Sequence, residues 1–323
     1  MNRVFFIVGP TATGKSEIAA EIASRLNAEV ISADAFQIYR GLDRLSAKPE
    51  NTTLAKAPHH LLSVVPLSEE MNAEKFRAAA VGAIQEIQAR EKHAIVVGGS
   101  GLYIKALTHG LSRLPGADPK LRAQLGELSL DELRQQLFAL DPVAARTIDV
   151  KNRRRVTRAL EICLLTGKPV SEQRAQAVAA SPGAARRGET ETCENHASRS
   201  EAATAGVFVF RERAELYERI DRRVEKMFTE GVMEEVRALG ELGSTAEKAL
   251  GLREIRALLA GEMSKTECIA KIQQATRRYA KRQLTWFQRQ SNFEPLNLSF
   301  HGSAEAIELI AQRVRLAFAQ MDD

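Results

Sequence analysis

The chain has 323 residues, of which 44% are hydrophobic, and a net charge of +5 from 46 Lys and Arg against 41 Asp and Glu. No run approaches the ~18 apolar residues of a membrane helix, and residues 4–8 are too short for a secretion signal. Cys163, Cys193 and Cys268 are far apart, which argues against a zinc site or a disulfide framework. We therefore expect a cytoplasmic protein with no membrane segment.

The N-terminal part alternates between short apolar runs and helical patterns. Residues 4–8, 29–33 and 94–97 are typical of buried parallel strands. Apolar residues at helical spacing predict helices at 16–26 and 72–92. Strands that alternate with helices in this way indicate a parallel sheet with right-handed crossovers.

The pattern changes after Leu114. Residues 119–168 contain helical segments only, including a helix at 152–166 that Gly167 ends. Residues 175–205 have almost no large apolar side chains, so we expect a flexible loop there. A strand at 207–210 follows, and then long helices at about 213–239, 249–260 and 264–290.

These elements predict an α/β fold with a P-loop NTPase-like parallel-sheet core and a helical insertion domain. We expect the core to comprise residues 1–114 and 206–323. The insertion would then comprise residues 115–205, with its flexible loop at about 175–205.

A complete P-loop follows the first predicted strand, with the sequence Gly9-Pro10-Thr11-Ala12-Thr13-Gly14-Lys15-Ser16. Its glycines let backbone N–H groups point at a phosphate, and the next helix adds the positive end of its dipole. In such a loop Lys15 reaches the outer phosphates and the Ser16 hydroxyl binds Mg²⁺. The motif therefore predicts a site for a phosphorylated small molecule with Mg²⁺, as in ATP-binding proteins.

Asp34 follows the second predicted strand, at the sheet edge where open α/β folds bind ligands. P-loop kinases and ATPases hold Mg²⁺ with a carboxylate at the end of another strand. Here residues 94–97 lead into Gly98, Gly99 and Ser100 instead. From spacing alone, Asp34 is equally a general base or the cap of a turn.

Basic residues gather at 151–155, 211–223 and 277–282. Such clusters suit polyanions such as RNA or a diphosphate, although solvated helix faces are an equally good explanation of each.

Several segments of the chain, in the same order, resemble the tRNA dimethylallyltransferases. Besides residues 9–16, these are ISADAFQIYRGLD at 31–43, AKP at 47–49, PHHL at 58–61, VGGSGLYIKAL at 97–107, RVTRALE at 155–161 and ATRRYAKRQLTWF at 275–287. The resemblance implies transfer of a dimethylallyl group from dimethylallyl diphosphate to N6 of the adenine 3′-adjacent to the anticodon. The implied partners are dimethylallyl diphosphate and a tRNA anticodon stem-loop, bound by a monomer.

The resemblance also assigns the site. The P-loop would hold the diphosphate leaving group, with Lys15, Ser16-bound Mg²⁺, Arg219 and Arg223 neutralising its charge. Asp34 would be the general base, and Ser100, where the family usually has Thr, would hydrogen-bond nearby. The residues expected to contact tRNA are Asp34, Ala35, Phe36, Gln37, Ser100, Arg122, Arg154, Arg155, Val156, Thr157, Arg158, Lys248, Arg253, Lys281, Arg282 and Gln283.

Besides Ser100, the chain departs from the family pattern at three places. Ala35 stands where Ser is common, and residues 43–49 read DRLSAKP where DIGTAKP is usual. Leu252 stands where an aromatic residue is frequent, which weakens any stacking role there. These departures affect local contacts and leave the catalytic set complete.

Three other functions are consistent with part of this pattern, but each leaves some of it unexplained. An enzyme that prenylates free adenine nucleotides would not need the arginine clusters. A P-loop kinase would need the missing strand-end acid. A non-catalytic RNA-binding protein would not need Lys15, Ser16 and Asp34 together.

Overall fold

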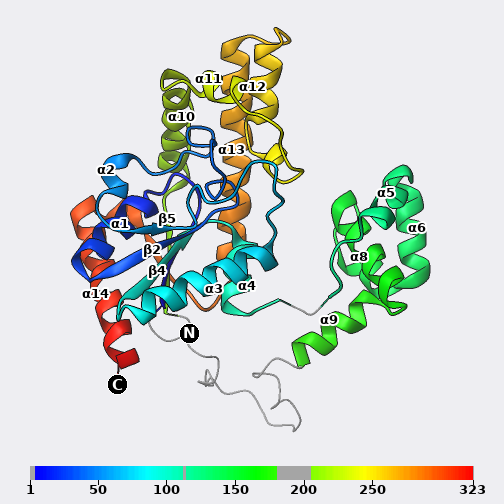
Figure 1. The fold of residues 1–323 in the computed structure, drawn as a ribbon, viewed down its shortest axis with the longest axis horizontal. Coiled ribbons are helices and arrows are strands. Elements are labelled where there is room, and N and C mark those ends of the chain that lie inside the picture. The colour runs from blue at the N-terminus through cyan, green and yellow to red at the C-terminus, as the bar shows by residue number, and fades with distance from the viewer. Residues whose placement is uncertain (1–3, 112–113, 180–204, 323) are drawn as a thin grey trace. The chain divides into compact units, whose positions relative to one another are not determined.

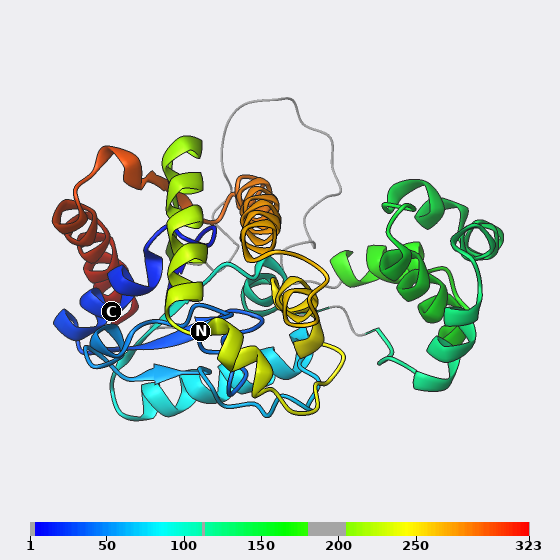
Figure 2. The same cartoon turned by 90° about the horizontal axis from the view of Figure 1, so that it is seen from above.

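The computed structural model describes residues 4–111, 114–179 and 205–322, and of 175–179 and 320–322 it describes the backbone only. The chain divides into two compact units (Figures 1 and 2). One comprises Met1–Gly110 with Ala202–Asp323, and the other is Leu111–Glu201. We call them the core unit and the helical unit. No described helix is both long enough and apolar enough to cross a bilayer.

The core unit is built on a parallel sheet, as the sequence predicted. In the described residues it has six strands in the order β3-β2-β4-β1-β5-β6. The two strands that the sequence did not predict, β3 and β6, lie at its edges. The strands are β1 (Val4–Val8), β2 (Ala28–Ala33), β3 (His59–His60), β4 (His93–Gly98), β5 (Gly206–Phe210) and β6 (Glu294–Asn297).

Helices cover both faces of this sheet, which explains why its central strands are apolar throughout. Helix α1 (Lys15–Arg25) and helix α14 (Ser303–Asp322) lie side by side, and both pack with the face that carries Phe5 and Ile7 (Figure 1). Phe6 points to the opposite face, which is covered by α3 (Ala73–Ala89) and α4 (Gly101–Thr108). The predicted helices at 16–26 and 72–92 are therefore confirmed.

The parallel register brings the carboxyl ends of the central strands to one edge. Val8 and Ala33 are both register partners of Gly98, and Val8 is also paired with Phe208. The loops that follow these residues carry the P-loop, Asp34 and Ser100. The fold therefore gathers the predicted site residues from separate parts of the sequence.

The C-terminal helices stand beside the sheet, with α10 (Arg213–Thr229) next to α13 (Lys265–Phe287) (Figure 1). The prediction of one helix at 213–239 was wrong, because Gly231 has a φ of 90° and separates α10 from α11 (Val232–Arg237). Only glycine adopts this backbone conformation easily, so the chain turns there. The remaining short elements are α2 (Asn51–Leu54), η1 (Ala246–Lys248), α12 (Leu252–Leu259) and η2 (Leu298–Phe300).

The helical unit contains α5 (Pro119–Glu127), α6 (Leu130–Leu140), α7 (Pro142–Thr147), α8 (Arg153–Thr166) and α9 (Val170–Ala179). Helix α8 begins after Asn152, whose side chain caps Arg155 N–H, and ends at Gly167 in the left-handed conformation, as predicted. The prediction placed the start of the flexible loop too early, at residue 175, because α9 continues to Ala179. The rest of that predicted loop, residues 180–204, lies outside the described residues.

Candidate active site

The P-loop connects β1 to α1, and its glycines meet specific backbone demands. A Cβ atom on Gly9 would lie 2.1 Å from the carbonyl oxygen of Val209 on the neighbouring strand. Gly14 caps α1 with a φ of 93°, a conformation that costs other residues free energy. The loop therefore keeps the sharp path that directs backbone N–H groups toward a phosphate.

Four cationic side chains surround this loop. The Lys15 ammonium donates to Pro10 O at 2.9 Å, and Arg211 Nε donates to Thr13 O at 3.0 Å. From α10, Arg219 Nε donates to Ala12 O at 2.8 Å and Arg223 Nη1 donates to Thr11 Oγ1 at 2.8 Å. The prediction had included Arg219 and Arg223 but not Arg211, whose only sequence signal was its place in the basic run at 211–223.

The positive charges are crowded. Burial lowers the pKa of Lys15 to about 8, the Asp34 carboxylate acts in the opposite direction, and the Arg223 guanidinium lowers it further. Burial also lowers the pKa of Arg219 and that of Arg223, although a guanidinium keeps its charge at neutral pH. A polyanion bound here would relieve the repulsion between these groups.

Asp34 lies just beyond β2 and fixes a turn. Its Oδ1 accepts the backbone N–H groups of Phe36 at 2.9 Å and Gln37 at 3.2 Å. Because both bonds use Oδ1, the other oxygen, Oδ2, is available for a substrate proton. The two interpretations left open by the sequence are therefore compatible, since one carboxylate can cap the turn and act as a base.

Ser100 brings a hydroxyl to the same place, because its Oγ accepts Ala35 N–H at 3.0 Å. Tyr279, on α13, is a neighbour that the sequence analysis did not assign. Burial and the negative charge of Asp34 raise the pKa of its phenol, while hydrogen bonds with Ser100 and Gln283 act in the opposite direction. The signal in the sequence was weak: Tyr279 lies one helical turn before Gln283.

Gln283 was predicted to contact tRNA, but its side chain is buried between two loops. Its side chain bridges two loops, because Oε1 accepts Thr11 N–H at 2.9 Å and Nε2 donates to Gly99 O at 2.9 Å. The residue is only 6% exposed. It therefore holds the P-loop against the loop after β4, with both the oxygen and the nitrogen of its amide bonded within the protein.

Lys15, Asp34, Arg219 and Arg223 border one space, a cavity of about 1030 Å³ in the core unit, whereas Arg211, Ser100, Tyr279 and Gln283 are not among its lining residues. Lys15 and Ser16 line it on the P-loop side, Asp34 and Val97 on the side of the sheet, and Met227 on the side of α10. Further lining residues are Gln37, Asp43, Arg44, Ala47, Lys48, Pro49, Glu50, Arg219, Arg222, Arg223 and Lys226. The cavity is at the upper end of ligand pockets, which are typically about 300–1,000 Å³, and has room for two reactants.

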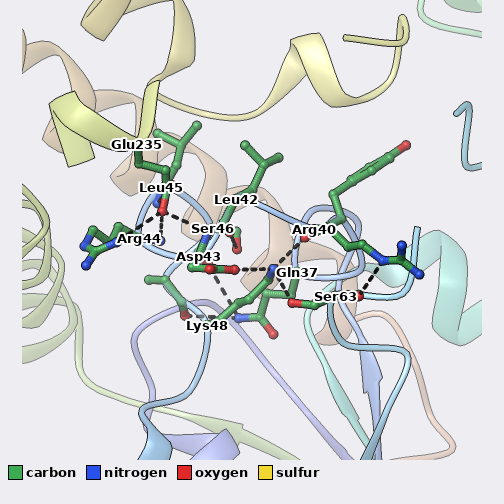
Figure 3. Close-up of polar contacts among 12 residues, drawn as sticks. Gln37, Arg40, Leu42, Asp43, Arg44, Leu45, Ser46, Lys48, Ser63 and Glu235 are labelled. Atoms are coloured by element: carbon green, nitrogen blue, oxygen red, sulfur yellow. Dashed lines mark hydrogen bonds and ion pairs between the residues drawn. The ribbon is translucent and has the colours of Figure 1, made fainter. Parts of the chain in front are cut away.

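The loop of residues 42–49 forms part of the cavity wall through Asp43, Arg44, Ala47, Lys48 and Pro49. Figure 3 shows its polar contacts. Lys48 fixes it from inside, because its ammonium donates to Tyr39 O at 2.5 Å, Ser63 Oγ at 2.6 Å and Asp43 Oδ1 at 2.7 Å. The Gln37 amide donates to Ala47 O at 3.1 Å. We call residues 42–49 the wall loop.

Comparison with known proteins identifies this arrangement. Residues 37–290 match the family model described as IPP transferase. The chain belongs to the IPP transferase family. It is 40% identical to the tRNA dimethylallyltransferase of Akkermansia muciniphila over 302 residues, which cover 94% of this chain and 96% of that protein. It is 41% identical to tRNA dimethylallyltransferase 1 of Citrifermentans bemidjiense over 294 residues, which cover 90% of each.

Solved structures of the family have the same fold. The full-length tRNA isopentenylpyrophosphate transferase of Bacillus halodurans matches with a TM-score of 0.68 and 31% identity, covering 100% of this chain and 98% of that one. A eukaryotic dimethylallyltransferase described as acting on tRNA matches with a TM-score of 0.74 over 96% of this chain and 78% of that one. Its identity is 24%, so it supports the fold alone.

Within this IPP transferase, the predicted tRNA-contact residues of the helical unit differ in accessibility. Arg154 and Arg155 are exposed on α8, and Thr157 is partly buried. The prediction that Val156 contacts tRNA was wrong. Its side chain is completely buried in the core of the unit and cannot reach an external ligand.

Arg122 and Arg158, also in the helical unit, already have a partner. Both form ion pairs with Glu161, whose side chain is completely buried, at 2.9 Å and 2.6 Å. Burial would raise the pKa of Glu161, but the hydrogen bonds from Arg122 and Arg158 outweigh it and the pKa is lowered. These arginines therefore compensate a buried carboxylate, and any contact with RNA would be additional to that role.

The remaining predicted contacts lie on the surface of the core unit. Lys248 is exposed on η1, Arg253 on α12, and Lys281 and Arg282 on α13. Ala35, Phe36 and Gln37 are partly buried beside Asp34. Leu252, at the position where the family frequently has an aromatic residue, is 1% exposed and packs in the core.

Proposed function

We propose that this chain transfers the dimethylallyl group of dimethylallyl diphosphate to N6 of the adenine that follows the anticodon of a tRNA, releasing diphosphate. The observation that supports this most directly is the shared cavity. It has the cationic P-loop on one side and Asp34 on the other, so a diphosphate and an acceptor base have room to meet.

The P-loop side suits the leaving group. As the C–O bond of the allylic substrate breaks, negative charge builds on the diphosphate oxygens. Lys15, Arg219 and Arg223 are positioned around the loop to stabilise that charge. Because burial has already weakened their solvation, they gain more from the developing charge than exposed cations would.

A magnesium site fits the residues present here. The described residues contain no group of three or more His, Cys, Asp or Glu that could enclose a metal ion. Mg²⁺ at phosphate sites needs only one or two protein ligands, because phosphate oxygens and water complete its octahedron. Ser16 lines the cavity at the start of α1 and would provide the hydroxyl ligand. Bound Mg²⁺ would neutralise diphosphate charge.

The other side of the cavity suits the acceptor. The adenine N6 lone pair forms the new C–N bond, and Asp34 Oδ2 takes the proton that N6 loses. Holding N6 against the allylic carbon is expected to provide much of the rate, because this amine is a poor nucleophile. The Ser100 hydroxyl accepts Ala35 N–H next to Asp34 and hydrogen-bonds the Tyr279 phenol, so this pair supports the acceptor side of the cavity.

An RNA acceptor is supported by the charged surface. A base within an anticodon loop must be flipped out before it can react. Unpaired loops are bound by cationic and aromatic side chains, and Lys281 and Arg282 are exposed on the same helix as Tyr279. A kinase is less well supported, because β4 ends at Gly98 without a metal-binding acid.

The test uses the purified protein, Mg²⁺, labelled dimethylallyl diphosphate and an unmodified tRNA with adenine after its anticodon. Label in the RNA, with much less for Asp34→Ala, is the expected result. Label in free AMP with none in the RNA would replace the proposed acceptor. Consumption of ATP without prenyl transfer would support a kinase instead.

A further inference from the structure

Glu235 forms three hydrogen bonds with a segment about 190 positions earlier in the chain. On α11, its Oε2 accepts the backbone N–H groups of Asp43 at 3.0 Å and Arg44 at 2.7 Å, and its Oε1 accepts Leu45 N–H at 2.9 Å (Figure 3). Its side chain is 7% exposed. One carboxylate thus binds three consecutive N–H groups of the wall loop.

These bonds account for the path of the wall loop. Residues 43–45 lie outside any helix or strand, so regular secondary structure gives these three N–H groups no partner. Hydrogen bonds to an ionised acceptor are also about twice as strong as neutral ones. Leu45 adds an apolar anchor, because its side chain is 6% exposed and packs in the core. The loop is therefore fixed from the α11 side by charge and by burial.

Two carbonyl groups of the wall loop accept hydrogen bonds from side chains of the candidate active site, one on the P-loop side and one on the Asp34 side. The Ser46 carbonyl accepts from Arg223 Nη2 at 3.1 Å, while the other end of that guanidinium bonds Thr11 in the P-loop. The Ala47 carbonyl accepts from the Gln37 amide, and Gln37 N–H in turn binds Asp34 Oδ1. Ser46 and Ala47, which provide these two carbonyls, follow directly after residues 43–45, whose N–H groups bind Glu235.

We propose that Glu235 is a positioning residue for prenyl transfer, which holds the wall loop so that Ser46 O aims Arg223 at the diphosphate and Ala47 O aims Gln37 beside Asp34. This inference rests on the proposed function of the same cavity. Glu235 itself does not line the cavity, so it acts through the loop and not on a reactant.

The test variant is Glu235→Gln, which keeps the size of the side chain but has only one oxygen for three N–H groups. The matched control is Glu234→Gln, the same change at the preceding position of α11, where the side chain is 69% exposed and forms an ion pair with Arg237 at 3.4 Å. Steady-state kinetics of prenyl transfer and titration of Mg²⁺-diphosphate by calorimetry are measured for each.

For Glu235→Gln we expect the KM for dimethylallyl diphosphate and the Kd for Mg²⁺-diphosphate each to rise about tenfold. The KM for tRNA should rise less, by about two- to threefold, through the displaced Gln37. If Glu235 acts through Arg223, the two changes are not additive. In an Arg223→Ala background, Glu235→Gln should therefore alter diphosphate affinity less than about twofold. Glu234→Gln should behave like the wild type.

The inference is overturned if Glu235→Gln lowers Tm while both constants stay within twofold, because that result indicates a structural role only. Full additivity with Arg223→Ala overturns it as well. Should Glu235→Gln fail to fold, Glu235→Asp keeps both oxygens on a shorter side chain, and unchanged diphosphate affinity in that variant counts against the inference. A wild type that prenylates no RNA contradicts the proposed acceptor, while the diphosphate titration still tests Glu235.

Discussion

The side-chain oxygen of Gln283, on α13, accepts the backbone N–H of Thr11 in the P-loop at 2.9 Å, although the two residues are 272 positions apart. The amide nitrogen of the same side chain donates to Gly99 O. One buried amide therefore connects α13 to the loop that would hold the diphosphate and to the loop that carries Ser100. The C-terminal helices thus belong to the site as much as the P-loop does.

We predict that Gln283→Leu weakens diphosphate binding. The leucine leaves Thr11 N–H and Gly99 O without partners in a buried place, which costs about 1–3 kcal/mol for each group left unsatisfied. Part of that cost is expected as a lower Tm and part as a several-fold higher KM for dimethylallyl diphosphate. Gln288→Leu, at an exposed position after α13, is the control. Equal kinetics in the two variants would contradict this role of Gln283.

Most of the sheet could be predicted from the sequence because its strands are buried on both faces. Continuous apolar runs such as residues 4–8 and 94–97 leave few alternatives when helices alternate with them. The edge strand β3 has only His59 and His60, and β6 contains Pro295, so neither carries a strand pattern. They form because neighbouring strands offer them hydrogen-bond partners, and that depends on the tertiary structure.

The candidate site was predictable where chemistry is local and not where it depends on packing. The P-loop and Asp34 follow strands directly, so their placement follows from sheet topology. Val156 directly follows a basic run, but its side chain is one of those that α8 turns toward the core of the helical unit. Glu235 has no neighbour in sequence that indicates its role, because the three N–H groups that it binds are about 190 positions away.

Asp34→Asn should separate the two roles of this side chain. The asparagine oxygen can still accept the N–H groups of Phe36 and Gln37, so the turn and the Tm should be preserved. The amide cannot accept the proton from N6, and loss of a general base lowers kcat by about 10²–10⁴-fold. The KM for dimethylallyl diphosphate should change only a few-fold. A variant with kcat within threefold of the wild type would remove Asp34 from the chemistry.

Glu29 should stabilise the fold in a pH-dependent way. Burial would raise the pKa of Glu29, but hydrogen bonds from His60, Lys92 and Arg90 outweigh it and lower the pKa to about 2. A carboxyl with a depressed pKa in the folded state stabilises above its unfolded pKa and loses this contribution as pH falls. Glu29→Gln should therefore lower the free energy of unfolding by about 3 kcal/mol at pH 7, and by roughly half as much near pH 3.

Urea unfolding at the two pH values measures this difference, with Glu86→Gln on the exposed face of α3 as the control. The same ΔΔG at both pH values would show that the Glu29 contribution is not electrostatic. A loss of unfolding free energy at pH 7 no larger than that caused by Glu86→Gln would contradict the importance of the Glu29 ion pairs.

The low pKa of Lys15 predicts the pH dependence of catalysis. Because burial lowers this pKa to about 8, the free enzyme loses a positive charge at the P-loop as pH rises through that value. The protonated form is the one that attracts the diphosphate, and kcat/KM reports groups of the free enzyme. The kcat/KM for dimethylallyl diphosphate should therefore be level below pH 8 and fall above it, approaching tenfold per pH unit. Lys15→Arg keeps its charge throughout this range, so its kcat/KM, although lower, should stay level to pH 9.5. If both proteins decline in parallel above pH 8, a group other than Lys15 controls the step.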